Sequence, residues 1–387
     1  MLSFKRVGVV SALCATLVCP VARGAEETDI SAQFHGSVAF LYQGDFSAAV
    51  LREQGIDVGQ LNRKVGTFDT RVRFGLAPGV ELWLGLPVQV SGSMEFSNIS
   101  PMVPCSGDEV SPDGCLYGTS AGTTLVVGVD VYGNPAWAAN PADPTAVGPT
   151  YSIHGARDLM VGLRYAPFSE KNLGRKDRKP GQLKPMATWV LDAALAIPVG
   201  DSWYERQDGT QGAANGAIGA QLHTAVSTRL PHAEPYVSVT WRINPAYDLY
   251  LDPTSLEAVE VDPANKLEVF TGVELVPYEE LRMDSRFGVD VAMAYQMEGA
   301  GKWPSGVYLP SILTEGDNAT AGQVVPIDER IALGGRLQLH YHIFRYVSAH
   351  VGGDLYYFLP QRVEHPYSVR YGRDLATGVN MGLTGHF

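Results

Sequence analysis

The carboxyl-terminal stretch Asp374–Phe387 reads DLATGVNMGLTGHF and alternates large apolar residues with small or polar ones. Residues two apart lie on the same side of a pleated strand, so the stretch predicts a strand with two unlike faces. One face carries Leu375, Thr377, Val379, Met381, Leu383, Gly385 and Phe387, and the other carries Asp374, Ala376, Gly378, Asn380, Gly382, Thr384 and His386. Lipid against the first face and a polar interior behind the second would satisfy both.

The same alternation recurs in other segments, which together with the last one predict twelve strands. These segments are Gln33–Gln43, Thr67–Leu76, Leu82–Val90, Asp158–Phe168, Thr188–Val199, Ile218–Leu230, Tyr236–Arg242, Leu267–Leu275, Leu281–Met297, Ile331–His342 and Tyr346–Phe358. The stretch Thr123–Tyr132 also alternates. It favours an extracellular hairpin, but it leaves a count of fourteen open. Pro87 and Pro198 each remove a ladder hydrogen bond, so we expect bulges or strand ends there.

The connections between these strands alternate in length. Short ones are Ala77–Val80, Pro231–Pro235, Val276–Glu280 and Ile343–Arg345, with the longer Ser169–Met186 as an exception. Long ones are Gly44–Gly66, Glu95–Arg157, Gly200–Gly216, Ile243–Lys266, Glu298–Arg330 and Leu359–Arg373. Short periplasmic turns and long extracellular loops are typical of transmembrane barrels. The chain therefore predicts an all-β, up-and-down antiparallel barrel with both termini in the periplasm.

The predicted outer faces hold no Asp, Glu, Lys or Arg, whereas the opposite faces hold many. A charge on a lipid-facing site at mid-bilayer costs about 2 to 4 kcal/mol, so this pattern indicates a boundary with lipid. Aromatic residues gather near the strand ends and predict interfacial girdles: Tyr42, Phe68, Trp189, Trp241, Tyr295, Tyr341, Tyr357 and Phe387. We expect the bacterial outer membrane as the location and its lipids as partners.

The amino-terminal segment has Lys5 and Arg6, an apolar run over Val7–Val18 and a small-residue exit at Ala22–Ala25. This pattern predicts a secretory signal peptide over residues 1–24 and a barrel over residues 25–387, with the long loop at 95–157. Cys105 and Cys115 are close in sequence and predict a disulfide in that loop. The net charge of −12 argues against nucleic acid as a partner.

The inward faces carry charges of both signs that predict a polar lumen. We expect the candidate selectivity residues to be Asp69, Arg71, Arg73, Arg164, Asp192, Arg229, Arg242, Glu268, Arg282, Asp284, Arg286, Asp290, Arg336, His340, His350 and Asp354. Charges inside one lumen must pair or stay hydrated. Two interpretations stay open: a network of ion pairs that stiffens and narrows the barrel, and a conduit that orients small polar or charged solutes.

Two other kinds of site receive weaker support. His340, His342 and His350 point inward on neighbouring strands, but no cysteine accompanies them and their register is unknown, so polar lining is favoured over metal binding. A membrane hydrolase needs a serine, a histidine and an orienting residue in one cluster at the outer rim, and the chain has no G-x-S-x-G sequence. We expect no cofactor, no metal and no enzymatic activity.

Several short motifs resemble a known family. They are Arg73-Phe74-Gly75-Leu76, Glu81-Leu82, Gly85-Leu86-Pro87, Gly155-Ala156-Arg157-Asp158-Leu159 and Gly162-Leu163-Arg164-Tyr165. They resemble the outer-membrane transporters associated with meta-pathway phenol degradation, over roughly Gly66–Phe168. The resemblance implies a barrel with a tight hairpin. Phe387 as the last residue is also similar to the terminal signature of Gram-negative barrels and implies recognition by the barrel-assembly machinery.

These observations favour a porin-like channel or transporter for passive passage of small polar or aromatic solutes. The first alternative is a membrane-embedded hydrolase with a rim active site. The second alternative is a closed structural barrel whose extracellular loops bind a partner.

Overall fold

The computed structural model describes residues 34–53, 56–97, 150–168, 186–200, 210–211, 217–230, 232–250, 258–280, 285–304, 324–344, 346–362 and 370–387. Among these residues, no helix is long and apolar enough to cross a membrane. Twelve long antiparallel strands form the main sheet. They are β1 (Gly36–Glu53), β2 (Ile56–Ala77), β3 (Val80–Ser97), β6 (Asp158–Phe168), β7 (Met186–Pro198), β9 (Gly219–Arg229), β10 (Ala233–Ile243), β13 (Lys266–Glu280), β14 (Ser285–Glu298), β17 (Arg330–Phe344), β18 (Val347–Phe358) and β20 (Arg370–His386).

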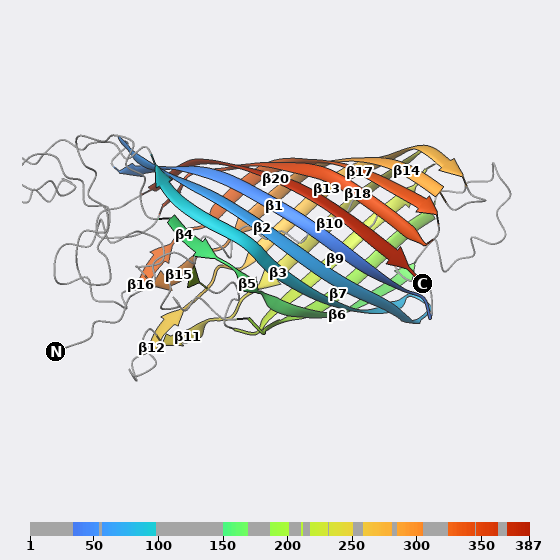
Figure 1. The fold of residues 1–387 in the computed structure, drawn as a ribbon, viewed down its shortest axis with the longest axis horizontal. Coiled ribbons are helices and arrows are strands. Elements are labelled where there is room, and N and C mark those ends of the chain that lie inside the picture. Colours follow the sequence, from blue (N-terminus) through green and yellow to red (C-terminus); the bar gives the residue numbers. More distant parts are fainter. Residues whose placement is uncertain are drawn as a thin grey trace, which may run out of the picture.

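The strands close into a barrel in which each long strand pairs with its neighbours along the chain (Figure 1). The ring is sealed where β1 pairs with β20, while β2 pairs with both β1 and β3. At the seal, the amides of Gly36 and Phe387 each donate a 2.9 Å hydrogen bond to the other residue's carbonyl. Closure removes the unpaired strand edges that lipid cannot hydrogen-bond. The predicted twelve-stranded barrel is confirmed, while Thr123–Tyr132 lies outside the described residues.

Tight turns lie at the end of the barrel that also holds the carboxyl terminus, which we name the turn end (Figure 1). Pro78 and Gly79 form the turn between β2 and β3, and Gly79 has a φ of 76°. Glycine adopts this left-handed conformation without the steric cost of a Cβ atom. The opposite end carries the short additional strands, and we name it the loop end.

The outer surface of the barrel is an apolar belt. Its exposed side chains include Leu82, Leu84, Leu163, Leu191, Leu195, Val237, Val291, Leu333, Leu337, Val351, Leu355, Leu375, Val379, Met381 and Leu383. The predicted girdle residues Tyr42, Phe68, Trp189, Trp241, Tyr341, Tyr357 and Phe387 are also exposed. Lys64 is exposed on the loop-side part of β2, beyond the predicted strand. An apolar belt between aromatic girdles is the surface that a barrel presents to a bilayer.

The predicted long loops are wrong in part, because several of them contain β-structure. Residues 44–66 were expected to be a loop, but β1 continues to Glu53 and β2 begins at Ile56. About 9 to 11 residues span a bilayer, so the 18 residues of β1 extend well beyond it. The pairing of β1 with β2 continues beyond the membrane because the backbone hydrogen bonds do not depend on lipid. Outward Phe46 still alternates there with inward Asp45.

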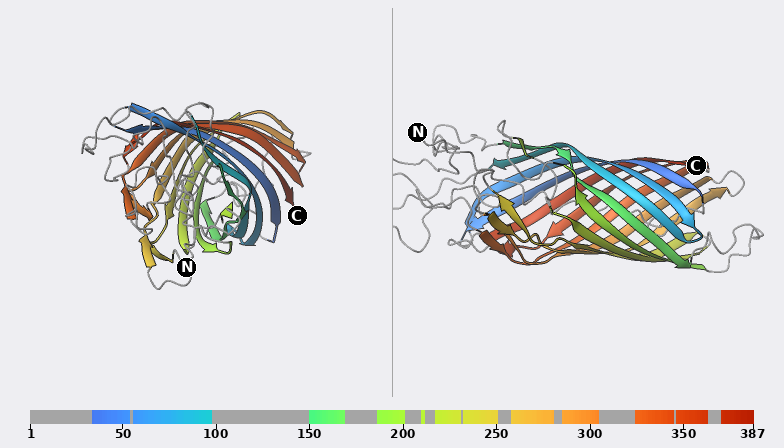
Figure 2. Two further views of the ribbon diagram at one scale, coloured as in Figure 1. Left: turned by 60° about the vertical axis from the view of Figure 1, so that its left-hand side comes forward. Right: turned by 90° about the horizontal axis from the view of Figure 1, so that it is seen from below.

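Short strands add to the loop end. They are β4 (Thr150–Ile153), β5 (Gly155–Ala156), β8 (Thr210–Gln211), β11 (Tyr247–Tyr250), β12 (Ala258–Val261), β15 (Gly301–Pro304), β16 (Val324–Ile327) and β19 (Gln361–Arg362). The hairpins β11–β12 and β15–β16 are linked by a bridge between Asp262 and Lys302. Burial, and secondarily Asp158 on β6, raises the pKa of Tyr247 on β11. Figure 2 shows these short strands at the end of the barrel opposite the carboxyl terminus.

The two prolines have the predicted effects. Pro198 is the last residue of β7. Pro87 lies inside β3, where the pairing of β3 with β6 ends at Gly85 and resumes with β5 at Val88. The carbonyl of Pro87 instead accepts a 2.9 Å hydrogen bond from the amide of Arg157.

Candidate functional site: the barrel interior

The structure places the predicted lumen residues that it describes on the inner face of the barrel. They lie in phase with buried neighbours along their strands, and many are themselves nearly fully buried. Arg282 and Asp284 lie outside the described residues, as do Cys105, Cys115 and residues 1–24. The roles of these residues in selectivity, in a disulfide and in export stay predictions.

The Asp192 cluster consists of Asp192, Arg164 and Trp83, from β7, β6 and β3. Asp192 Oδ1 accepts a 3.0 Å hydrogen bond from Trp83 Nε1, and Oδ2 accepts bonds of 3.1 and 3.0 Å from Nε and a terminal nitrogen of Arg164. The indole fits because Gly162 has no side chain: a Cβ there would lie 2.3 Å from Trp83. Both carboxylate oxygens are therefore engaged, and the cluster ties three strands together.

Next to this cluster, β2 contributes further pairs. Arg71 forms a 2.7 Å ion pair with Asp69, and its guanidinium lies 5.6 Å from the Trp83 ring centre. Arg73 lies 3.9 Å from the fully buried Glu81.

The turn end of the interior is bridged on the other side by Arg286 on β14. Its guanidinium lies 2.9 Å from Glu274 on β13 and 3.3 Å from Glu234 on β10. Ser227 donates a 2.9 Å hydrogen bond to the second oxygen of Glu234. Arg229 on β9 pairs with Glu279 on β13, a partner that the candidate list did not contain. Arg242 on β10 instead donates to the side chain of Gln221.

The Asp290 cluster consists of Tyr236, Asp290, Arg336 and Gln338, from β10, β14 and β17. Asp290 Oδ2 accepts a 3.1 Å hydrogen bond from the Tyr236 hydroxyl and lies 3.4 Å from Arg336 Nε. Arg336 also donates a 3.0 Å bond to the Tyr236 oxygen. These bonds link β10 with β17 across the two strands between them, β13 and β14.

A chain of amides continues from this cluster towards β20. Gln338 Nε2 donates 3.1 Å to Asn380 Oδ1, and Asn380 Nδ2 donates 3.2 Å to Asp354 Oδ2. Asp354 and Asp45 converge over Gly378, where a Cβ would lie 3.2 Å from an oxygen of each. A side chain at Gly378 would therefore press on both carboxylates.

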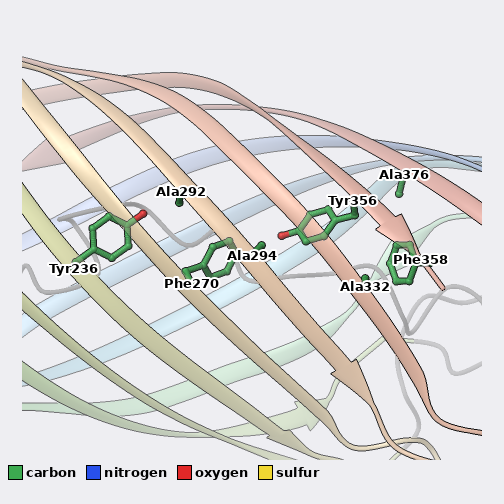
Figure 3. Packing of buried hydrophobic residues seen from close by; sticks show 8 residues of the cluster. All are labelled: Tyr236, Phe270, Ala292, Ala294, Ala332, Tyr356, Phe358 and Ala376. Carbon is green, nitrogen blue, oxygen red and sulfur yellow. The ribbon is translucent and has the colours of Figure 1, made fainter.

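An aromatic row crosses the inner wall, and the predicted site did not contain it. Figure 3 shows Tyr236, Phe270, Tyr356 and Phe358 in a row, with small residues beside them. The alanines are Ala292, Ala294, Ala332 and Ala376. The guanidinium of Arg336 lies 4.4 Å from the Phe270 ring centre, and that of Arg330 lies 3.9 Å from the Phe358 ring centre. The row thus interleaves rings with cations.

The sequence carried a signal for this row. Phe270 is in phase with inward Glu268, Tyr236 with Glu234, and Tyr356 with Asp354. An aromatic residue in phase with charges does not belong to the lipid face. The Tyr356 hydroxyl in fact donates a 3.4 Å hydrogen bond to Glu268.

Four histidines gather near the turn end on β17, β18 and β20. The rings of register partners His340 and His350 have centres 5.9 Å apart, and those of His342 and His386 are stacked at 6.3 Å. In the described part of the chain, no group of three or more His, Cys, Asp or Glu side chains is placed to hold a metal ion. Ser348 Oγ lies 3.2 Å from His386 Nε2. This pair lies at the turn end, whereas the hydrolase alternative needs its cluster at the outer rim.

Several buried carboxylates use only one of their oxygens. Oδ2 of Asp69 pairs with Arg71, and Oδ2 of Asp374 pairs with Arg330 near the loop end. Oδ1 of Asp69, Asp290 and Asp374 is buried and accepts no hydrogen bond from the residues that the structure describes. Buried polar atoms are normally hydrogen-bonded, so these oxygens are spare acceptors inside the lumen.

The closed strands, the apolar belt and the charged interior together define a β-barrel of the bacterial outer membrane. The fold implied by the resemblance at residues 66–168 is thereby confirmed. No family model matches the chain, and no curated protein matches it.

Solved structures with similar folds include both channels and an enzyme. An outer membrane channel from Pseudomonas putida F1 has 11% identity and a TM-score of 0.47, and the match covers 96% of this chain and 100% of that one. A Pseudomonas aeruginosa FadL homologue has 9% identity and a TM-score of 0.39 over 99% and 98%. The outer membrane protease OmpT of Escherichia coli has 7% identity and a TM-score of 0.32 over 93% and 100%.

Proposed function

We propose that the chain is an outer-membrane channel for passive passage of small solutes, with polar and aromatic groups on its path. The observation that carries this proposal is the set of spare buried acceptors at Asp69, Asp290 and Asp374. Asp69 and Asp290 lie in the turn-end part of their strands, and Asp374 lies near the loop end of β20. A barrel built only for rigidity gains nothing from these oxygens, because each unpaired buried acceptor costs about 1 to 3 kcal/mol.

Several side chains of the inner wall are closely packed. Glu81, Asp290 and Gln338 are 0% exposed and Phe270 is 2% exposed, so water does not reach these side chains in this conformation. A wide aqueous pore would leave its wall wet. We therefore infer a selective channel in which a solute exchanges hydrogen bonds with the wall, and not a molecular sieve.

The aromatic row supports the inclusion of aromatic solutes. Rings at Tyr236, Phe270, Tyr356 and Phe358 offer flat apolar contacts, and the neighbouring guanidinium groups offer contacts to charge or to a π face.

The test is flux through the purified, folded protein in liposomes and planar bilayers. We expect discrete single-channel currents of low conductance, and uptake of small aromatic solutes that exceeds uptake of sugars of similar size. A barrel that neither conducts ions nor admits any small solute would contradict the proposal and would favour the closed structural barrel. Release of product from ester substrates by the purified, folded protein would instead favour the hydrolase.

A further inference from the structure

The inner wall at β14 and β17 holds two spare acceptors side by side. Asp290 on β14 and Gln338 on β17 are register partners, and both side chains are 0% exposed. Asp290 Oδ1 and Gln338 Oε1 are buried and accept no hydrogen bond from the residues that the structure describes. Cβ atoms of directly paired residues lie about 4.5 to 5.5 Å apart, so one small group can contact both side chains.

The orientation of the Gln338 amide follows from its neighbours. An ionised carboxylate only accepts hydrogen bonds, so Asp354 requires the NH2 group of Asn380. The side-chain oxygen of Asn380 then faces Gln338, so the donor on Gln338 must be Nε2. Gln338 Oε1 therefore points away from Asn380, and the neighbouring strand on the other side, β14, carries Asp290.

Two carboxyl groups and one guanidinium lie near the two oxygens. Asp290 and Asp354 both lie near Arg336, the register partner of Asp354. Arg336 Nε lies 3.4 Å from Asp290 Oδ2, and Arg336 is paired in register with Asp354. Two acceptors with excess negative charge favour a cationic donor over a neutral or anionic group.

The surroundings also favour an organic cation. Tyr236 and Phe270 of the aromatic row belong to the same region, since Arg336 contacts both of them. We propose that Asp290 Oδ1 and Gln338 Oε1 form a recognition point for the primary ammonium group of a small aromatic cation in the lumen. An entering ammonium group displaces no hydrogen bond of the chain at these two oxygens. This inference rests on the proposed channel function and names a class of solute for it.

The test measures binding without transport. The full chain, folded in detergent micelles, is titrated by calorimetry with benzylammonium, benzyl alcohol and benzoate, which share a shape and differ in charge. We expect benzylammonium to bind at least about tenfold more tightly than benzyl alcohol, as one charge-assisted hydrogen bond provides, and benzoate not to bind.

Two variants remove the acceptors separately. Asp290→Asn keeps an oxygen for Tyr236 but loses the charge, and Gln338→Met keeps the length but cannot accept. Each should weaken benzylammonium binding about tenfold and leave benzyl alcohol unchanged. Far-ultraviolet circular dichroism confirms that each variant is folded.

Matched controls have the same residue types with their acceptors already in use. Glu234→Gln changes a carboxylate bonded to Ser227 and Arg286, and Gln221→Met changes an amide bonded to Arg242. Both should bind benzylammonium like the unchanged chain.

Three results would overturn the inference: equal binding of benzylammonium and benzyl alcohol, unchanged binding in both Asp290→Asn and Gln338→Met, or ammonium chloride binding as tightly as benzylammonium. Flux assays stay separate. Binding without any flux would contradict the channel and leave the site standing, whereas flux without selective binding would contradict the site alone.

Discussion

The Asp192 cluster and the Asp290 cluster are built from similar groups but differ in how completely they are used. Each has a buried aspartate, an arginine and an aromatic donor. At Asp192 both oxygens are bonded, at 3.0 to 3.1 Å. At Asp290 one oxygen receives the tyrosine and a longer arginine contact, and the other receives nothing from the described residues. The difference separates a site that holds strands together from one that can still bind a partner.

The largest expected effect is at the saturated site. Asp192→Ala leaves the buried guanidinium of Arg164 and the indole N–H of Trp83 without their acceptor. Loss of one partner of a buried pair costs about 3 to 5 kcal/mol, so the free energy of unfolding should fall by that amount. Urea titration of the protein folded in lipid vesicles measures it. A loss below about 1 kcal/mol would mean that the cluster does not hold the strands.

The lipid-facing surface provides a reference cost in folding free energy for two sides of the barrel, at β7 and at β20. Val379→Arg on β20 and Leu191→Arg on β7 each place a charge in the apolar belt, and each should cost about 2 to 4 kcal/mol of folding free energy. The same urea titration applies, together with the yield of membrane-inserted protein. A cost at only one of these two positions would show that the outer faces of β7 and β20 are in contact with different solvents.

A smaller effect is expected when the saturated site loses one donor. Trp83→Phe keeps most of the ring but removes the N–H that bonds Asp192 Oδ1. Because the acceptor is charged, the expected loss is about 1.5 to 3 kcal/mol of unfolding free energy. If Asp192→Ala and Trp83→Phe were combined, the effects should not add, because they remove the same bond.

The smallest effect is expected at the unsaturated site. Gln338→Met removes the bond to Asn380, worth about 0.5 to 1.5 kcal/mol, and also removes a buried acceptor that has no protein partner. The two terms oppose one another, so the net change in unfolding free energy should stay within about 1 kcal/mol. A loss as large as that of Asp192→Ala would erase the contrast between the clusters.

The wall of the barrel could be predicted from the sequence because every strand has lipid on one face and the polar interior on the other. Segment 158–168 was predicted with the bounds that β6 has, since Leu159, Val161, Leu163 and Tyr165 mark one apolar face in phase there. Segment 44–66 was missed as strand because beyond the membrane the outer face need not be apolar. Hydropathy then stops marking the strand while the backbone ladder continues.

The charged lining could be predicted residue by residue, but its pairings could not. Which residue meets Asp192 depends on register across β3, β6 and β7, which alternation does not encode. The aromatic row was missed for a different reason: aromatic residues were considered only on the outer faces, although Phe270 and Tyr356 stand in phase with inward carboxylates. Phase, and not residue type, decides which side of such a wall a ring occupies.

The backbone bonds between Gly36 and Phe387 make closure of the ring depend on β20, the long strand farthest along the chain from β1. Until β20 docks against β1, an incomplete chain carries two rows of bare peptide groups that hydrocarbon cannot solvate. A chain lacking β20 should therefore stall at the membrane surface and not shrink into an eleven-stranded cylinder. Conversely, because Gly36 already contacts Phe387, joining these two residues directly and reopening the chain at Pro78–Gly79 should yield the same cylinder from a rearranged gene.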